Sequence, residues 1–349
     1  MADVALVTGG AGFIGSHVAD ELLARGLRVV VLDDLSGGFR ENVPETAEFV
    51  EGSITDAHLI DDLFSRYRFD YVYHLAAYAA EGLSHFIRKF NYENNLIGSM
   101  NLINASVNHA VRCFVFTSSI AVYGKNQLPM TEEMVPVPED PYGIAKLAVE
   151  QDLRASHEIF GLDYVVFRPH NVYGERQNIG DRYRNVVGIF MNQLMQEQPM
   201  TIFGDGTQSR AFSYIQDVAP IIASSPFNRD ALNQVFNVGA ETPYTVNELA
   251  DIVAKSMGCQ KDIVYLDARN EVLHAFSSHY KLHQAFGDAP VVSLEDGISR
   301  MASWAKEVGA KASKTFEGVE ILKNMPKSWR NELSRSKEST NAKTQDSYS

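Results

Sequence analysis

The first 33 residues contain the pattern that most constrains how this chain folds. Residues 4–7 read VALV, residues 8–15 read TGGAGFIG, and residues 29–33 read VVVLD after a run of helix-forming residues. A strand, a glycine turn, a helix and a second strand ending in an acid form the β-α-β unit of a dinucleotide site. The glycines let backbone N–H groups approach a pyrophosphate at the positive end of the helix. We therefore predict a dinucleotide site over residues 4–33.

Asp33 indicates which dinucleotide is bound. It lies eighteen residues beyond Gly15, where a carboxylate accepts hydrogen bonds from the hydroxyls of the adenosine ribose. The same charge repels a 2′-phosphate, and the next residues are Asp34 and Leu35 rather than an arginine. We expect NAD rather than NADP.

Apolar runs and amphipathic segments continue to alternate up to about residue 172. We expect strands over residues 49–52, 71–77, 112–117 and 164–168. We expect helices over residues 57–67 and 91–109, and a third that begins at Pro141 behind the N-cap residue Asp140. This alternation predicts an α/β fold with a Rossmann-type, doubly wound parallel sheet covered on both faces.

Beyond residue 172 the alternation weakens, and the glycines at 204 and 206 suggest a hairpin-like piece. We expect an NAD-binding domain over residues 1–172, with parts of 213–240. Residues 173–330 are expected to form mainly a smaller, irregular α/β substrate-binding region at the carboxyl ends of the strands. Residues 334–349 are polar and aperiodic, which predicts a disordered tail.

Composition excludes several functional classes. The net charge of −13 argues against a general binder of nucleic acid or of anionic membranes, which need basic surface. Apolar residues make up 45% of the chain, enough for a packed core, but no run reaches the ~18 that a membrane span needs. Cys113 and Cys259 have no metal-ligand spacing, so no metal is expected, and no signal peptide is visible. We expect a soluble, cytoplasmic protein.

Two groups of residues suggest chemistry. Tyr142 and Lys146 are four apart just inside a helix, on one face, where an ammonium group lowers the pKa of a phenol from its usual value of about 10. Such a tyrosine can act as a general base. Ser119 ends an apolar strand twenty-three residues before Tyr142 and would point into the ligand crevice. Each pattern also occurs on ordinary helix surfaces and in loops, so neither decides the function alone.

Further motifs accompany these residues. They are HLAA at 74–77, Asn95 with Gly98, TSS at 117–119 with VYG at 122–124, Pro141 and Tyr142 with Lys146, and RPHNVYG at 168–174. With the glycine turn, they resemble the extended short-chain dehydrogenase/reductases. Within these the chain is most similar to nucleotide-sugar epimerases of the UDP-glucose/UDP-galactose 4-epimerase type, over about residues 3–305.

The resemblance implies a mechanism. Tyr142 would take the proton of the sugar 4-hydroxyl, Lys146 would lower its pKa and bind the nicotinamide ribose, and Ser119 would hydrogen-bond the same sugar oxygen. The hydride would pass to NAD and return to the opposite face of the 4-keto sugar, so that NAD is retained. The catalytic residues implied are Ser119, Tyr142 and Lys146.

The resemblance also implies binding residues. Those for the cofactor are Gly9, Gly12, Phe13, Ile14, Gly15, Asp33, Ser53, Ile54, Leu75, Ala76, Ala77, Asn95, Tyr142 and Lys146. Those for a UDP-sugar substrate are Ser119, Tyr142, Asn171, Arg210 and Arg269, with the two arginines expected to bind its diphosphate.

Some residues depart from related activities or from the family pattern. Sugar 4,6-dehydratases carry acids immediately after the hydroxyl residue, where this chain has Ile120 and Ala121, and glucuronate decarboxylases carry Glu at the second position. The family usually has Asp where this chain has Ser53 and Ala211, and a proline in the loop that here spans residues 82–88. That loop borders the sugar, so the sugar itself stays open.

Three functions remain. The first is a UDP-sugar 4-epimerase, the second a nucleotide-sugar oxidoreductase with net exchange of NAD(H), and the third a non-catalytic NAD-binding regulator. The resemblance also implies a homodimer through residues 91–109 and 142–160. Apolar Leu96, Ile97, Met100 and Ile103 fit that interface and fit plain core packing equally.

Overall fold

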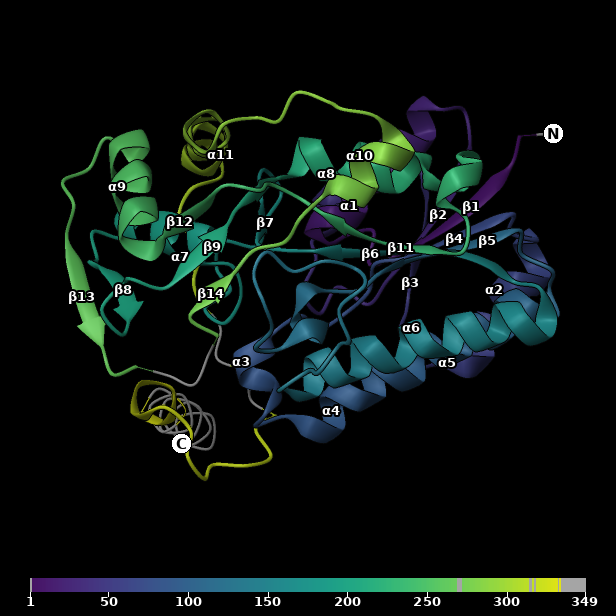
Figure 1. Cartoon of the computed structure of the whole chain (residues 1–349), viewed down its shortest axis with the longest axis horizontal. Coiled ribbons are helices and arrows are strands. Elements are labelled where there is room, and N and C mark those ends of the chain that lie inside the picture. The colour runs from purple at the N-terminus through teal and green to yellow at the C-terminus, as the bar shows by residue number, and fades with distance from the viewer. Residues whose placement is uncertain (1, 269–271, 314–315, 317, 332, 334–349) are drawn as a thin grey trace, which may run out of the picture.

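The computed structural model describes residues 2–268, 272–313, 316, 318–331 and 333. A seven-stranded parallel sheet, ordered β11-β6-β5-β4-β1-β2-β3, forms its centre (Figure 1). The strands are β1 (Val4–Thr8), β2 (Arg28–Asp33), β3 (Glu48–Glu51), β4 (Tyr71–His74), β5 (Cys113–Thr117), β6 (Asp163–Pro169) and β11 (Gln234–Val238). The first six follow the Rossmann order. The predicted fold class is confirmed, and Cys113 is buried in this sheet.

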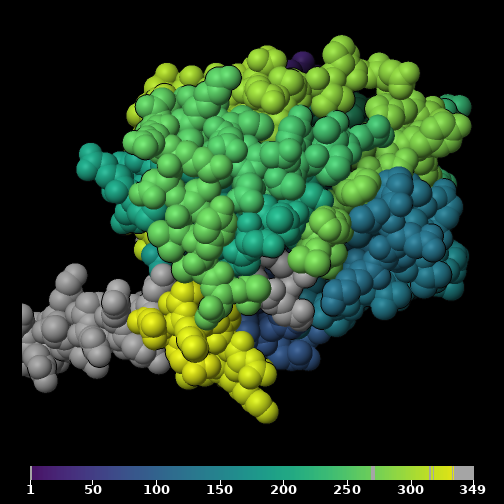
Figure 2. Space-filling model, turned by 60° about the vertical axis from the view of Figure 1, so that its left-hand side comes forward, coloured from purple at the N-terminus to yellow at the C-terminus, as the bar shows by residue number. Residues whose placement is uncertain are grey.

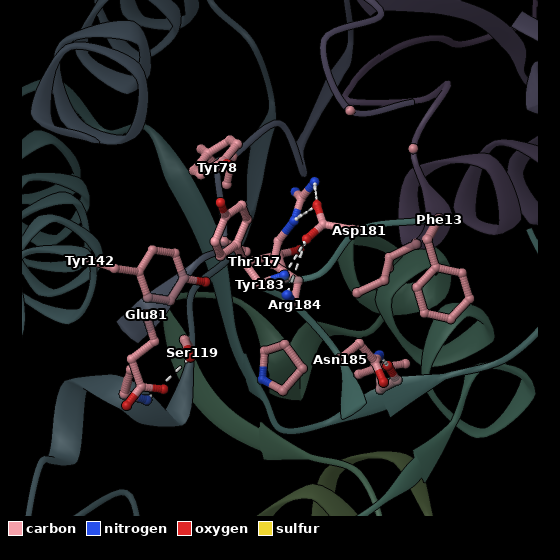
Figure 3. Close-up of a pocket in the computed structure, with 18 of the residues that line it drawn as sticks. Phe13, Tyr78, Glu81, Thr117, Ser119, Tyr142, Asp181, Tyr183, Arg184 and Asn185 are labelled. Atoms are coloured by element: carbon pink, nitrogen blue, oxygen red, sulfur yellow. Dashed lines mark hydrogen bonds and ion pairs between the residues drawn. The ribbon is translucent and has the colours of Figure 1, made fainter. Parts of the chain in front are cut away.

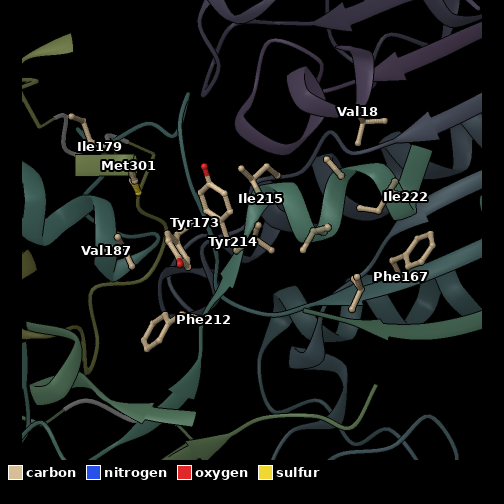
Figure 4. Packing of buried hydrophobic residues seen from close by; sticks show 14 of the residues in the cluster. Val18, Phe167, Tyr173, Ile179, Val187, Phe212, Tyr214, Ile215, Ile222 and Met301 are labelled. Atoms are coloured by element: carbon tan, nitrogen blue, oxygen red, sulfur yellow. The ribbon is translucent and has the colours of Figure 1, made fainter. Parts of the chain in front are cut away.

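Helices cover both faces of the sheet (Figure 1). One face carries α1 (Phe13–Ala24) and α8 (Ile215–Ser224). The other carries α2 (Ala57–Tyr67), α5 (Gly98–Asn108) and α6 (Pro141–Phe160). Figure 4 shows the first core, where Val18 of α1 and Ile222 of α8 lie over Phe167 of β6. Central strands buried on both faces read as continuous apolar runs, which is why the sequence located them.

Local residues set both the start and the end of helix α6. The Asp140 side chain accepts a hydrogen bond from Gly143 N at 2.9 Å, and Pro141 occupies the first turn, where its missing N–H has no partner to lose. Gly161 ends the helix with φ of +75°, a conformation that costs glycine little. This start fixes Tyr142 in the first turn of α6.

The helix expected over residues 91–109 is confirmed up to Asn108; it begins earlier, at Arg88, and contains a π-helical stretch. The segment after β4 contains α3 (Glu81–Ser84), α4 (Arg88–Tyr92), a π-helical stretch (Glu93–Ile97) and then α5. Two amides at this stretch bind other segments: Asn91 Nδ2 donates to Pro141 O, and Asn95 binds the backbone of Tyr78. Their side chains tie the loop after β4 to α6.

The second region is built from small sheets and helices at the carboxyl ends of the main strands. Its elements are β7 (Val172–Tyr173), α7 (Val186–Met195), β8 (Met200–Phe203), β9 (Ser209–Ala211), β10 (Ser213–Tyr214), β12 (Pro243–Thr245), α9 (Val246–Met257), β13 (Ile263–Leu266), β14 (His274–Ala275) and α11 (Leu294–Val308). Helix α10 (Tyr280–Phe286) packs on the main sheet instead, where Phe286 contacts Phe167 and Phe236. Short 3₁₀ turns span Arg40–Asn42, Ile120–Tyr123, Ser225–Phe227 and Arg229–Ala231.

The hairpin expected around residues 204–206 is wrong. Gly204 and Gly206 turn the chain at φ of +77° and +78°, but β8 pairs with β13, whereas β9 pairs with β12 and β14. The turn therefore joins two sheets. A glycine turn is a local signal, whereas the strands that pair here lie between 32 and 65 residues apart in the sequence.

The predicted tail, 334–349, lies outside the described residues. Among those described, no helix combines the length and apolar character needed to cross a membrane.

Candidate active site

A cavity of about 560 Å³ opens at the carboxyl ends of the main strands, between the sheet and the second region. It is lined by sixteen of the predicted residues: Gly9, Gly12, Phe13, Ile14, Gly15, Asp33, Ser53, Ile54, Leu75, Ala76, Ala77, Ser119, Tyr142, Lys146, Asn171 and Arg210. Parallel strands place their carboxyl ends at one edge, and this edge is where open α/β sheets bind ligands.

The glycine turn leaves no room for side chains. Gly9 has φ of +71°, and a Cβ there would lie 2.6 Å from Ala76 N. A Cβ on Gly15 would lie 2.1 Å from Gly9 O. Gly12 begins α1 without a side-chain cap, so the positive end of the helix is left for a ligand at the cavity. This cradle fits a pyrophosphate.

Asp33 joins the turn to the end of β2. Its Oδ2 accepts from Ala11 N at 3.0 Å, and its Oδ1 accepts from Leu35 N at 2.8 Å. Each carboxylate oxygen keeps a second lone pair for a ligand hydroxyl. Burial raises the pKa of Asp33, and the two backbone hydrogen bonds oppose this effect.

Ser119, Tyr142 and Lys146 lie together at the other end of the cavity, and Figure 3 shows the Tyr142 and Ser119 side chains close to each other. Ser119 precedes the 3₁₀ turn Ile120–Tyr123, and its Oγ accepts from Ala121 N at 3.1 Å. Lys146 Nζ donates to Thr117 O at 2.7 Å and lies 4.6 Å from the centre of the Phe116 ring.

Burial dominates the electrostatics of this group. Burial raises the pKa of Tyr142, although a hydrogen bond with Ser119 opposes the shift. Burial lowers the pKa of Lys146 to about 7, with the Glu150 charge opposing. Lys146 Nζ lies 5.8 Å from the centre of the Tyr142 ring while it donates to the Thr117 carbonyl, so burial, and not the Lys146 charge, sets the direction of the Tyr142 pKa shift in the protein by itself.

A buried network fixes the strand end that carries Ser119. Glu150 of α6 accepts two hydrogen bonds from Arg168 of β6, at 3.0 and 2.6 Å, and one from Ser118. Arg168 also donates to Tyr123 OH at 2.7 Å. The network connects β5, β6 and α6 at the point where each meets the cavity.

The cavity also contains unpaired buried atoms. Within the described part of the chain, Thr117 Oγ1 and Gln177 Oε1 have no hydrogen-bond partner, and both residues line the cavity. Buried polar atoms without partners are costly, so these atoms favour a polar ligand.

Asn95 does not line the cavity. Its Oδ1 accepts from Tyr78 N at 2.8 Å, and its Nδ2 donates to Tyr78 O at 3.1 Å. The Asn95 side chain is hydrogen-bonded to the loop after β4 and is not directed at a ligand.

The two predicted diphosphate arginines have different outcomes. Arg210 lines the cavity, but its guanidinium donates to the carbonyl oxygens of Val272 and of Leu273, the latter at 2.8 Å. It therefore does not present a fully available guanidinium to a phosphate. Arg269 lies outside the described residues.

Another arginine, which the sequence analysis missed, lies in the cavity. Figure 3 shows Arg184 bound to Asp181, with Tyr78 and Tyr183 nearby. Arg184 Nε donates to Asp181 Oδ2 at 2.7 Å, and its guanidinium carbon lies 4.9 Å from the centre of the Tyr78 ring. Glu81 also lines the cavity, and its charge contributes to the raised pKa of Tyr142. The only signal in the sequence was an irregular loop rich in Arg and Asn.

His170, the residue before Asn171, lines the cavity and stacks on His279. His170 Nε2 lies 3.2 Å from His279 Nε2, and the ring centres are 5.3 Å apart. Burial lowers the pKa of His170 to about 4 and, together with the charge of His170, lowers the pKa of His279 to about 3. Both rings are therefore neutral at physiological pH.

Comparison with known proteins identifies the family. The sequence profile of the NAD dependent epimerase/dehydratase family matches residues 5–239. The chain belongs to this family, and NAD is confirmed as its cofactor.

Individual relatives match nearly their whole length. The putative UDP-glucose 4-epimerase of Methanocaldococcus jannaschii is 34% identical over 306 residues, which cover 86% of this chain and 98% of the relative. The UDP-glucose 4-epimerase of Thermotoga maritima, solved with UDP-glucose, superposes with a TM-score of 0.84 at 36% identity, covering 87% of this chain and 99% of that one. The UDP-glucuronic acid 4-epimerase of Bacillus cereus, solved with UDP-glucuronic acid and NAD, gives a TM-score of 0.80 at 28% identity, covering 87% and 99%.

The histidine pair predicts a loss of stability in acid. Because the folded-state pKa values lie below the unfolded value of about 6.5, the unfolded chain binds more protons as the pH falls from 6.5 to 4. The free energy of unfolding should therefore fall over this window, by up to roughly 3 kcal/mol for each histidine. Urea unfolding near neutral pH and near pH 5 measures the loss.

Replacing one histidine should weaken this dependence. His279→Gln is expected to lose less unfolding free energy between the two pH values than the unaltered protein, whereas the exposed His58→Gln control should behave like the unaltered protein. An identical loss of unfolding free energy in all three proteins would show that the His170–His279 pair does not cause the acid dependence.

Proposed function

We propose that this protein is an NAD-dependent epimerase that inverts C4 of a nucleotide sugar, with UDP as the nucleotide. One observation carries the proposal: the glycine cradle and the Ser119–Tyr142–Lys146 group line the same cavity. Ile120 and Ala121 stand where dehydratases and decarboxylases place acids, so a base that acts on the 4-hydroxyl is present without the acids for those reactions.

The proposed roles follow from the positions of the side chains. Tyr142 accepts the proton of the sugar 4-hydroxyl, and Ser119 hydrogen-bonds the same oxygen. Lys146, held by the Thr117 carbonyl, binds a ribose hydroxyl of the cofactor. When bound, NAD would supply a reversible hydride acceptor for C4 and a positive charge that favours the Tyr142 phenolate.

Binding of the two ligands is divided between the two parts of the cavity. The glycine cradle and Asp33 are proposed to hold the pyrophosphate and adenosine ribose of NAD, with Ser53, Ile54 and residues 75–77 around them. Asn171 and Arg210 are proposed to face the nucleotide sugar. Arg210 would then share its donors between a phosphate and the carbonyl groups that it binds in the structure. Arg269 keeps its proposed place as the second phosphate-binding arginine.

The domain division follows the same geometry. We propose that residues 1–172 with parts of 213–240 form the NAD-binding unit, since β11 pairs with β6, and that residues 173–330 mainly form the sugar-nucleotide region. The two free cysteines fit a reducing compartment, the cytoplasm.

A panel of UDP-sugars tests the reaction. We expect NMR to show interconversion of one pair of 4-epimers among glucose, N-acetylglucosamine and glucuronate derivatives, without accumulation of free NADH. Release of NADH equal to the substrate consumed would establish the oxidoreductase instead. No conversion of any UDP-sugar would refute the proposed reaction.

Tyr142→Phe tests the base. The substitution removes only the hydroxyl, so kcat should fall by roughly 10²–10⁴-fold while NAD stays bound. Bound NAD is measured after denaturation, and Tyr164→Phe, a tyrosine on β6 distant from the cavity lining, is the control. Full activity in Tyr142→Phe would support the alternative that the protein is a non-catalytic NAD-binding regulator.

A homodimer is proposed through the face made by the segment around residue 97 and α6. Ile97 is 52% exposed and Ile144 is 42% exposed, whereas Ile103 is buried and belongs to the core. Light scattering should give twice the chain mass of 38.8 kDa. A monomeric mass that does not change with concentration would rule out this interface.

A further inference from the structure

The chain continues beyond the end of α11. About an eighth of its residues follow Val308, and the Methanocaldococcus and Thermotoga proteins, matched over nearly their whole length, leave a similar share of this chain unmatched. We call Phe316, residues 318–331 and Leu333 the C-terminal strap. Figure 2 shows the strap, in yellow, lying against the green second region and the blue loop that follows β4.

Backbone hydrogen bonds attach the strap to the loop after β4. Glu320 N donates to Phe86 O at 2.8 Å. The Glu320 carboxylate accepts from Lys89 N and from Phe90 N, each at 2.9 Å, at the start of α4. A carboxylate that accepts two backbone N–H groups at a helix start is a specific anchor.

Aromatic contacts extend the attachment to both sides of the cavity. The Phe316 ring centre lies 5.2 Å from that of Tyr78 and 5.0 Å from that of Phe90. Trp329, only 5% exposed, lies 5.2 Å from Tyr183 and 6.3 Å from Phe86, ring centre to ring centre. Trp329 therefore touches the loop after β4 and the second region at once.

The partners of the strap are themselves cavity residues. Tyr78 and Tyr183 line the cavity, and Arg184 lies over the Tyr78 ring while its guanidinium is bound to Asp181 (Figure 3). The charge of Arg184 acts to lower the pKa of Tyr142, against the effect of burial. The described strap residues do not line this cavity, so the strap can act on it only through these side chains.

We propose that the strap completes the substrate end of the cavity, with Phe316 and Trp329 as positioning residues that hold Tyr78 and Tyr183 and, through them, the Arg184 guanidinium toward an anionic group of the nucleotide sugar. The inference rests on the proposed function for the nature of the substrate. Arg184 would share its donors between that anionic group and the Asp181 carboxylate, as Arg210 would between a phosphate and its backbone carbonyls.

Kinetics of the full chain test the role of Trp329. Trp329→Ala should raise KM for the nucleotide sugar about tenfold, with kcat changed by less than about twofold, because binding is loosened and the reacting groups are untouched. The NAD content should stay unchanged, since the strap does not contact the glycine cradle. Trp329→Phe keeps an aromatic ring, so its KM should be close to that of the unaltered protein.

A matched control lies in the same segment. Leu322 is 52% exposed, and Leu322→Ala should leave KM unchanged. An unaltered KM in Trp329→Ala, or a loss of NAD in place of a rise in KM, would overturn the proposal.

A binding measurement separates this inference from the proposed reaction. The chain has two tryptophans, so Trp304→Phe leaves Trp329 as the sole indole fluorophore. Addition of UDP should change its emission, because Tyr183 joins the ring to the cavity. Calorimetric binding of UDP without any change in emission would reject the coupling. A chain that epimerises no sugar yet shows the emission change would reject only the proposed reaction.

Discussion

The geometry of the candidate active site depends on one buried ion pair. Glu150 of α6 and Arg168 of β6 are joined by two hydrogen bonds, and both side chains are about 95% buried. Ser118 donates to the same carboxylate, and Tyr123 accepts from the same guanidinium. Removing one partner of such a pair leaves an uncompensated buried charge. The end of β5, which carries Ser119, is thereby held at a fixed place relative to the helix that carries Tyr142 and Lys146.

Burial has opposite effects on the two ionisable groups of this site. It raises the pKa of Tyr142 and lowers that of Lys146 to about 7, so it disfavours the charged form of each. The protein by itself therefore holds the tyrosine protonated at neutral pH. A bound ligand with positive charge would favour the phenolate, which couples the presence of the cofactor to the availability of the base.

The sequence located the elements whose signals are local. The first β-α-β unit, the start of α6 at Asp140 and Pro141, and the buried strands were all predicted, since each depends on residues within a few positions or on burial of both sheet faces. The helix over residues 91–109 was predicted too, but not its π-helical stretch over Glu93–Ile97, near which the Asn91 and Asn95 amides bond to Pro141 and Tyr78. Arg184 was missed since its position depends on Tyr78, a hundred residues away.

By itself, the sequence determined the dinucleotide cradle and the fold class, because glycines, caps and apolar runs act on their immediate neighbours. It also supplied the identities of Ser119, Tyr142 and Lys146. Only the tertiary structure decided which charges face the cavity: it turned Arg210 toward backbone carbonyls, placed Arg184 over Tyr78, and brought Trp329 against Tyr183. These outcomes depend on packing between segments far apart in the chain, and no local pattern of residues encodes such packing.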